Sequence, residues 1–172
     1  NLETGYLFTY RDRDGVRTDR SNAAETTLRF GVIEDRLEVR ALWSGYVWGS
    51  SESGGVSTST DGWGDVALGL KLKVCDQDGL LPRLAVEAQS TLGTGSEGIS
   101  SQELEPVFKL LWSYDLGHGV TLGGNANLAF PTTDGDHFTQ GQGSIFASWA
   151  AFERTTFFAE FFVIGPYTKG SD

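Results

Sequence analysis

Nine charged residues interrupt segments of the chain that are otherwise apolar. They are Arg29, Glu38, Arg40, Asp65, Lys71, Lys73, Glu87, Lys109 and Glu160, five of them basic and four acidic. Charges of both signs that line a narrow passage can select ions, whereas charges that are buried together must pair as salt bridges. Both hypotheses require that these side chains point to the same side of the fold.

Three short acidic runs resemble fragments of calcium-binding loops. They are Asp12-Arg13-Asp14-Gly15, Asp76-Gln77-Asp78-Gly79 and Asp134-Gly135-Asp136. None has the full spacing with a distal glutamate, and Asp-Gly is first of all a turn signal. We therefore expect turns at these positions and no metal site.

The residues that most often carry catalysis or bind cofactors have no supporting motif. His118 and His137 are not accompanied by a Ser or Cys nucleophile motif, and Cys75 is the single cysteine. The run Gly93-Thr94-Gly95-Ser96 lacks the lysine of a phosphate-binding loop. The sequence thus predicts no enzyme activity, no catalytic residue and no cofactor.

The charged residues fall within segments whose apolar residues recur at every second position, as in β-strands. Glycine makes up 23 of the 172 residues and is scattered through these segments, which opposes helix formation. We expect about nine antiparallel strands in one domain spanning residues 1–172. The expected strands are 2–10, 28–32, 37–47, 66–74, 84–92, 108–114, 120–130, 142–149 and 156–163.

The expected connections alternate between long and short. Long polar loops are expected at 11–23, 49–62, 93–103 and 131–139, and short turns at 33–36, 75–82, 116–119 and 152–154. Outer-membrane barrels show this alternation, with short periplasmic turns and long extracellular loops. Strands of about nine to eleven residues also suit a tilted bilayer crossing. The pattern predicts an up-and-down transmembrane β-barrel.

The composition of the two strand faces indicates which face would meet lipid. The non-apolar faces are rich in Gly, Ala, Ser, Thr and Asn, whereas the water-exposed face of a soluble sheet is usually dense in Lys and Glu. Aromatic residues gather near the expected strand ends, as in interfacial girdles. They are Tyr6, Phe8, Tyr10, Trp43, Trp48, Trp63, Trp112, Tyr114, Phe130, Trp149 and Phe157, whereas Tyr46 falls on the non-apolar face of its expected strand. We expect the nine charged residues to line the lumen. The alternative is a soluble, lipocalin-like barrel that encloses its apolar face and binds a ligand there.

Charge and hydropathy narrow the classes of protein further. The formal net charge of −10 argues against a nucleic-acid partner, which would require a basic face. The chain has no apolar run of about 18 residues, which a transmembrane helix would need. Its first residues lack the features of a signal peptide. We expect a mature bacterial outer-membrane protein whose signal peptide has been removed, with membrane lipid and a small-molecule solute as partners.

An odd number of strands does not fit a single bacterial barrel, which uses an even number. The chain also ends at Lys169-Gly170-Ser171-Asp172, which looks like the beginning of a loop. We therefore expect further strands beyond this sequence. The alternative is that neighbouring copies in a homo-oligomer or a larger membrane assembly complete the sheet.

Five stretches of the sequence resemble the outer-membrane "transporter" family named after the MetA pathway of phenol degradation. They are TLRFGVIEDRLEVRA (27–41), GWGDVALGLKLKV (62–74), PRLAVEAQSTLGTGS (82–96), LGHGVTLGGNANLAF (116–130) and FERTTFFAEFFVIG (152–165). The resemblance implies an outer-membrane barrel that passes small, often aromatic or hydrophobic, compounds. It carries over no binding residue.

Three functions therefore stay open. The first is passive diffusion of small solutes through a lumen lined by the nine charged residues. The second is a filled, structural or adhesion barrel that binds partners through its long loops and conducts nothing. The third is the soluble ligand-binding barrel.

Overall fold

A computed structural model describes residues 1–13, 16–133 and 135–165 of the chain. These residues form antiparallel β-strands joined by turns and loops, so the expected all-β antiparallel fold is confirmed. Within the described part of the chain, no helix has the length and apolar character needed to cross a membrane. Asp14, Gly15 and Asp134, part of two acidic runs, lie outside the described residues, as do residues 166–172, on which the expectation of further strands was based.

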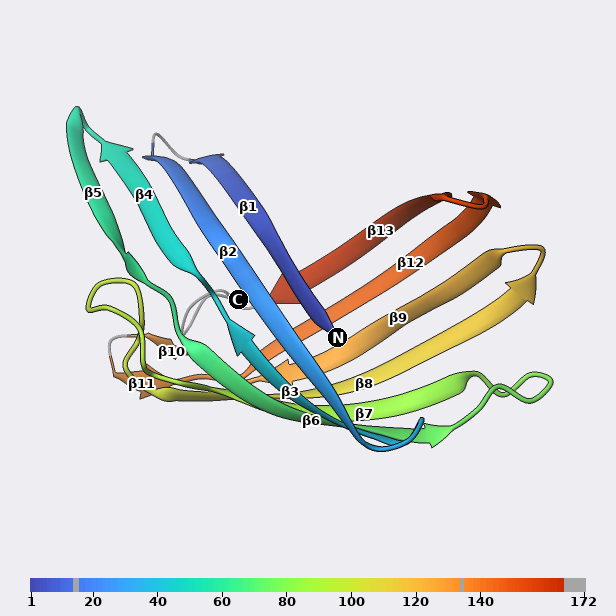
Figure 1. Cartoon of the computed structure of the whole chain (residues 1–172). Helices are drawn as coiled ribbons and strands as arrows, with labels where there is room; N and C mark the ends of the chain where they lie inside the picture. Colours follow the sequence, from blue (N-terminus) through green and yellow to red (C-terminus); the bar gives the residue numbers. More distant parts are fainter. Residues whose placement is uncertain (14–15, 134, 166–172) are drawn as a thin grey trace. The chain divides into compact units, whose positions relative to one another are not determined.

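The described residues form thirteen strands. These are β1 (Leu2–Arg13), β2 (Val16–Ile33), β3 (Leu37–Trp43), β4 (Tyr46–Ser53), β5 (Val56–Trp63), β6 (Val66–Cys75), β7 (Arg83–Leu92), β8 (Leu104–Gly117), β9 (Val120–Ala129), β10 (Thr132–Thr133), β11 (Asp136–His137), β12 (Gln140–Phe152) and β13 (Thr155–Gly165). Hydrogen bonds join eleven of them in the order β13-β12-β9-β8-β7-β6-β3-β2-β4-β5, with β1 paired to β2 (Figure 1). The short strands β10 and β11 pair separately.

The expected number of about nine strands differs from the thirteen observed for two reasons. First, an interruption at Ser44-Gly45 divides the expected strand 37–47 into β3 and β4, and the expected loop 49–62 contains β5, which a second interruption at Gly64-Asp65 separates from β6. The two interruptions lie side by side, since the Gly64 amide donates to the Gly45 carbonyl at 2.8 Å. Second, the expected loop 131–139 contains the small β10–β11 hairpin.

Two of the expected long loops are largely strand. The polar segment 11–23 belongs mostly to β1 and β2, which pair as far as Arg13 and Val16. Segment 49–62 forms the tight β4–β5 hairpin, which turns at Gly54-Gly55 (Figure 1). Segment 11–23 is rich in charged residues and segment 49–62 in Ser and Thr, and both lack apolar alternation, so hydropathy could not reveal them, although their backbone groups are fully able to form a ladder. The loop expected at 93–103 is confirmed between β7 and β8.

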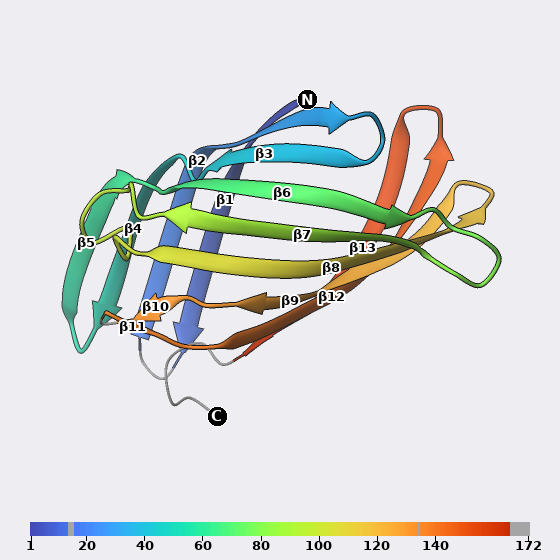
Figure 2. The ribbon, with the colours of Figure 1, turned by 90° about the horizontal axis from the view of Figure 1, so that it is seen from below.

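The chain divides into two compact units. Unit 1 comprises Asn1–Phe30, Arg40–Leu68 and Ser90–Leu104, and unit 2 comprises Gly31–Val39, Gly69–Gln89 and Glu105–Asp172. In unit 1, β2 pairs with β1 on one side and β4 on the other, and β4 pairs with β5. In unit 2, β8, β9, β12 and β13 form a meander in which each strand pairs with the next (Figure 2).

Burial along the strands is the reverse of that in a water-soluble sheet. In β6 the apolar side chains Leu68, Leu70, Leu72 and Val74 are 42–54% exposed, whereas Ala67 on the other face is only 6% exposed. The buried apolar side chains of the described residues are Val47 and three alanines. In β6 and β7 the fold therefore buries the small and polar face and exposes the large apolar one, as the sequence predicts. In β1 and β13 large apolar side chains are exposed on both faces, for example Phe157 at 56% and Phe158 at 75%.

One face assignment from the sequence is wrong. Continuous alternation from residue 37 to 47 would place Val47 with the exposed apolar side chains, but Val47 is 1% exposed and Trp48 is 41% exposed. The interruption at Ser44-Gly45 causes the change, because Gly45 has a φ of +73° and the alternation restarts at Tyr46. An irregularity in a strand shifts every later side chain to the opposite face.

Candidate functional site

A buried ionic contact joins β7 and β8 in unit 2. The Lys109 ammonium donates to the Glu87 carboxylate at 2.9 Å and to the Gln89 side-chain oxygen at 3.0 Å. The Glu87 side chain is inaccessible to solvent, and that of Lys109 is 22% exposed. The sequence placed both charges on one face, and the structure brings them into direct contact.

The same face continues across β9 and β12 as a row of amides. Lys109 lies opposite Asn127, and Asn127 lies opposite Gln142. The Gln142 amide donates to Gln140 at 2.7 Å, and Asn127 donates to Gln142 at 3.4 Å. We call Glu87, Gln89, Lys109, Asn127, Gln140 and Gln142 the polar row. The buried Asn127 side-chain oxygen has no hydrogen-bond partner among the described residues, so the row can accept a hydrogen bond from a water or a solute.

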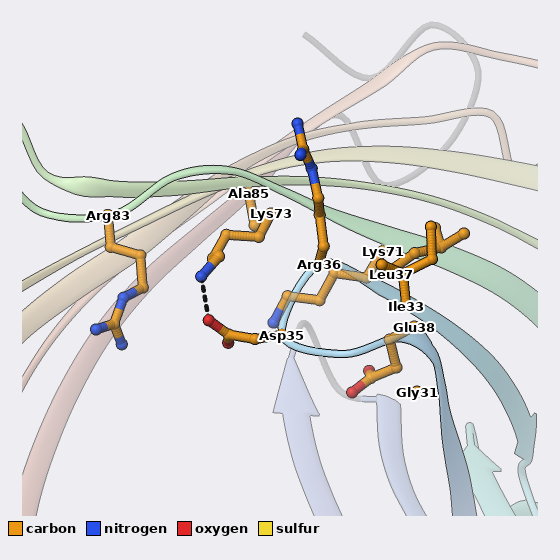
Figure 3. A pocket seen from close by; sticks show the side chains of 10 residues that line it. All are labelled: Gly31, Ile33, Asp35, Arg36, Leu37, Glu38, Lys71, Lys73, Arg83 and Ala85. Atoms are coloured by element: carbon orange, nitrogen blue, oxygen red, sulfur yellow. Dashed lines mark hydrogen bonds and ion pairs between the residues drawn. The ribbon is translucent and has the colours of Figure 1, made fainter.

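A second group of charges surrounds a pocket of about 250 Å³ in unit 2 (Figure 3). Lys71, Lys73 and Glu38 line it, as expected for residues on one face, together with Asp35, Arg36 and Arg83. Lys73 donates to Asp35 and, at 3.0 Å, to Asp76. The hydrogen bond and the charge of Lys73 hold the pKa of the Asp35 carboxyl below its usual value of 3.8. Four basic and two acidic side chains around one pocket give it a net positive lining.

The remaining predicted site residues do not join these groups. Arg29 of β2 pairs with Glu3 at 2.8 Å, and Arg40 of β3 is half-buried. Asp65 lies between β5 and β6, where it accepts hydrogen bonds from the loop 93–103. Glu160 is exposed on β13. The nine residues are thus distributed over both units, and five of them, Glu38, Lys71, Lys73, Glu87 and Lys109, belong to the two charged groups of unit 2.

Sequence reasoning missed the uncharged members of the polar row and the turn residue Asp35. Gln89, Asn127 and Gln142 were all on the non-apolar faces, but a selection by charge passes over amides. Asp35 was assigned only to a turn. A search of each polar face for any side chain with a hydrogen-bonding group would have found the amides.

Five aromatic rings lie together in unit 1, on the face of its strands opposite the buried Val47. Trp43 stacks on Trp63 at 5.6 Å between centroids, and Tyr46 meets the edge of Trp63 at 5.0 Å. Trp48 lies 6.2 Å from both Tyr46 and Tyr6. We call these five residues the aromatic band. Its members are among the girdle residues expected from the sequence, except for Tyr46, which the sequence placed on the inward face.

The two histidines and the cysteine belong to neither the polar row, the charged pocket nor the aromatic band. The His137 ring nitrogen Nδ1 lies 2.9 Å from the Thr132 hydroxyl, within the β10–β11 hairpin. His118 adopts a φ of +52° in the turn between β8 and β9, and the Cys75 thiol faces the Pro82 carbonyl. Over residues 1–13, 16–133 and 135–165, no three His, Cys, Asp or Glu side chains are grouped as metal ligands.

Comparison with models of known protein families gives a match that covers nearly the whole chain. The model of the family described as "Putative MetA-pathway of phenol degradation" matches residues 2–171. None of the curated proteins compared with the chain matches it significantly. The matched range contains both units, the polar row and the aromatic band, so the chain belongs to the family of the MetA pathway of phenol degradation.

Proposed function

We propose that this chain forms the wall of an outer-membrane β-barrel through which small solutes diffuse. The observation that carries the proposal is the direction of burial, with large apolar side chains exposed and the alternating small and polar ones buried. Exposing apolar surface to water costs about 25 cal/mol per Å², whereas contact with lipid removes this cost. The apolar face would therefore meet the hydrocarbon, and the polar row would face the lumen.

The aromatic band supports the same orientation. Trp and Tyr prefer the level of the lipid headgroups, where the ring is in an apolar environment and the polar atom reaches water. The five rings of the band belong to β1, β3, β4 and β5. They lie on the face of these strands opposite the one that carries Val47 and Gly62. We assign this band to one membrane interface.

The solute class follows from the family and from the lining. The family's description names phenol degradation, which favours small aromatic or hydrophobic compounds. The Glu87–Lys109 pair presents little net charge, and the amides of the polar row can bind a hydroxyl group in passing. We assign no catalytic step, metal or cofactor to the chain. We propose a bacterial outer-membrane location, with lipid as the partner and a homo-oligomer as the alternative to a barrel built by one chain.

Single-channel recording tests the proposal. The full-length, detergent-purified protein is inserted into a planar bilayer, and its folding is verified beforehand by circular dichroism. Discrete, long-lived current steps are expected, and added phenol should change their noise or amplitude. Folded and inserted protein that gives no current would refute the passive channel.

A second candidate is a filled barrel with a structural or adhesion role. It is favoured by the complete burial of Glu87 against Lys109, since a paired charge in a packed interior needs no passage. This barrel would insert into membranes but conduct nothing and bind partners through its loops. The lipocalin-like alternative would instead be extracted without detergent, and the exposed leucines of β6 argue against it.

A further inference from the structure

The loop 93–103, which we call the β7–β8 loop, is folded back against the strands of unit 1. The Ser96 amide donates to the Trp63 carbonyl at 2.8 Å, and the Trp63 amide donates to the Ser96 hydroxyl at 2.9 Å. A Cβ atom on Gly62 would lie 2.5 Å from the Cβ of Ser96, so only glycine permits this approach. The loop is therefore packed on the end of β5.

Asp65 is the anchor of this arrangement. Its carboxylate accepts hydrogen bonds from the Gly95 amide and the Ser100 hydroxyl, each at 2.8 Å. The next amide, that of Val66, donates to the Thr94 hydroxyl at 2.9 Å. Hydrogen bonds to an ionised acceptor are stronger than those between neutral groups. One carboxylate thus holds both sides of the loop.

The face that the loop covers is the one opposite the aromatic band. Gly98 and Ile99 at the loop tip line a pocket together with Val47, which is 1% exposed, and with Thr58 and Thr60, which are exposed and alternate with the same parity as Gly62 on β5. Trp48 and Trp63 of the aromatic band are 41% and 54% exposed on the other face. If the aromatic band meets the membrane interface, the loop lies on the lumen side.

We infer that the β7–β8 loop is a constriction inside the passage and that it limits the size of the solutes that pass. Asp65 is the positioning residue that holds the loop there. This inference rests on the proposed channel function and deepens it. Glu97, exposed at the loop tip, contributes a negative charge to the narrowest part of the passage. Small uncharged or weakly cationic compounds are then preferred over anions of the same size.

The variant Asp65→Ala tests the anchor, with Asp61→Asn as the matched control. Asp61 is a carboxylate on the preceding strand β5 that accepts a hydrogen bond from Tyr46 and none from the loop. In the full-length protein, Asp65→Ala should speed amide hydrogen exchange at Ser96 and Ile99 about tenfold or more, because two hydrogen bonds to a charged group are lost. It should also increase the single-channel conductance and admit larger polyethylene glycols. The control should change none of these quantities.

The variant Glu97→Lys tests whether the loop tip lies in the passage without loosening the loop. It should shift the reversal potential in a salt gradient towards anion selectivity, with loop exchange rates unchanged. Faster exchange in Asp65→Ala with unaltered conductance and size limit would overturn the inference while leaving the channel intact. Silence of the folded and inserted native protein would refute the passage itself, and the constriction with it.

Discussion

Replacing Lys109 with methionine tests the ionic contact at the centre of the polar row. The change removes the ammonium that donates to Glu87 at 2.9 Å while keeping an apolar side chain of similar length. Because the Glu87 side chain is inaccessible to solvent, water cannot replace the lost hydrogen bond. Breaking a buried ion pair by removing one partner costs about 3–5 kcal/mol. Since Lys109 is 22% exposed, we expect the lower end, a loss of about 3 kcal/mol.

The assay is equilibrium urea unfolding of the full-length protein in lipid vesicles, followed by tryptophan fluorescence. The double variant Glu87→Gln with Lys109→Met should recover stability to within about 1 kcal/mol of the native protein, since no charge is then left buried. Arg17→Met is the control, because the Arg17–Asp12 pair has side chains 63% and 51% exposed and should contribute less than about 1 kcal/mol. If Lys109→Met costs no more than Arg17→Met, the polar row is solvated and the reasoning fails.

Three further predictions concern packing, acid stability and selectivity. Gly124→Ala on β9 places a Cβ against the carbonyl of Ser144 and should lower the free energy of unfolding by about 1–3 kcal/mol in the same assay. Gly141→Ala is the control, because a Cβ on Gly141 meets its nearest atom at 3.7 Å. Equal losses in the two alanine variants would contradict the packing argument. Lys73 lowers the pKa of Asp35, so the stabilisation from this carboxylate is present above pH 3.8 and is lost as the pH falls through its lower folded-state pKa. The variant Asp35→Asn should therefore flatten the acid side of a curve of unfolding free energy against pH. An unchanged slope would exclude the contact between Lys73 and Asp35 in solution. The paired changes Lys71→Glu and Lys73→Glu should move a reversal potential towards cation selectivity, while an unaltered potential would place the pocket outside the passage.

Regular alternation allowed much of the sheet to be predicted from the sequence. In β6 and β7 the residue types alone place Glu87 and Lys71 on the face opposite Leu70 and Val86, and the structure agrees. The short turns and the loop 93–103 are also found where expected. These features follow from local chemistry, because a strand with two unlike faces can orient in only one way.

Features that depend on backbone irregularity or on contacts between strands could not be predicted. The face of Val47 depends on the positive φ of Gly45, which residue types do not specify. The Glu87–Lys109 contact depends on how the long loop between β7 and β8 sets the two strands against each other. The anchoring of the loop 93–103 by Asp65 could not be predicted for the same reason, since its partners lie 30 and 35 residues away in the chain.

The adjacent glycines Gly123 and Gly124 of β9 face opposite sides of the sheet in unit 2. A Cβ on Gly123 would lie 2.6 Å from the ring of Phe146, and one on Gly124 would lie 3.1 Å from the ring of Trp112. Each glycine thus provides the space for an aromatic ring on one face. In evolution each glycine and the ring beside it should change together. A relative with alanine at position 123 should carry a smaller residue at position 146, and substitution of either glycine without a change in its neighbouring ring should be rare.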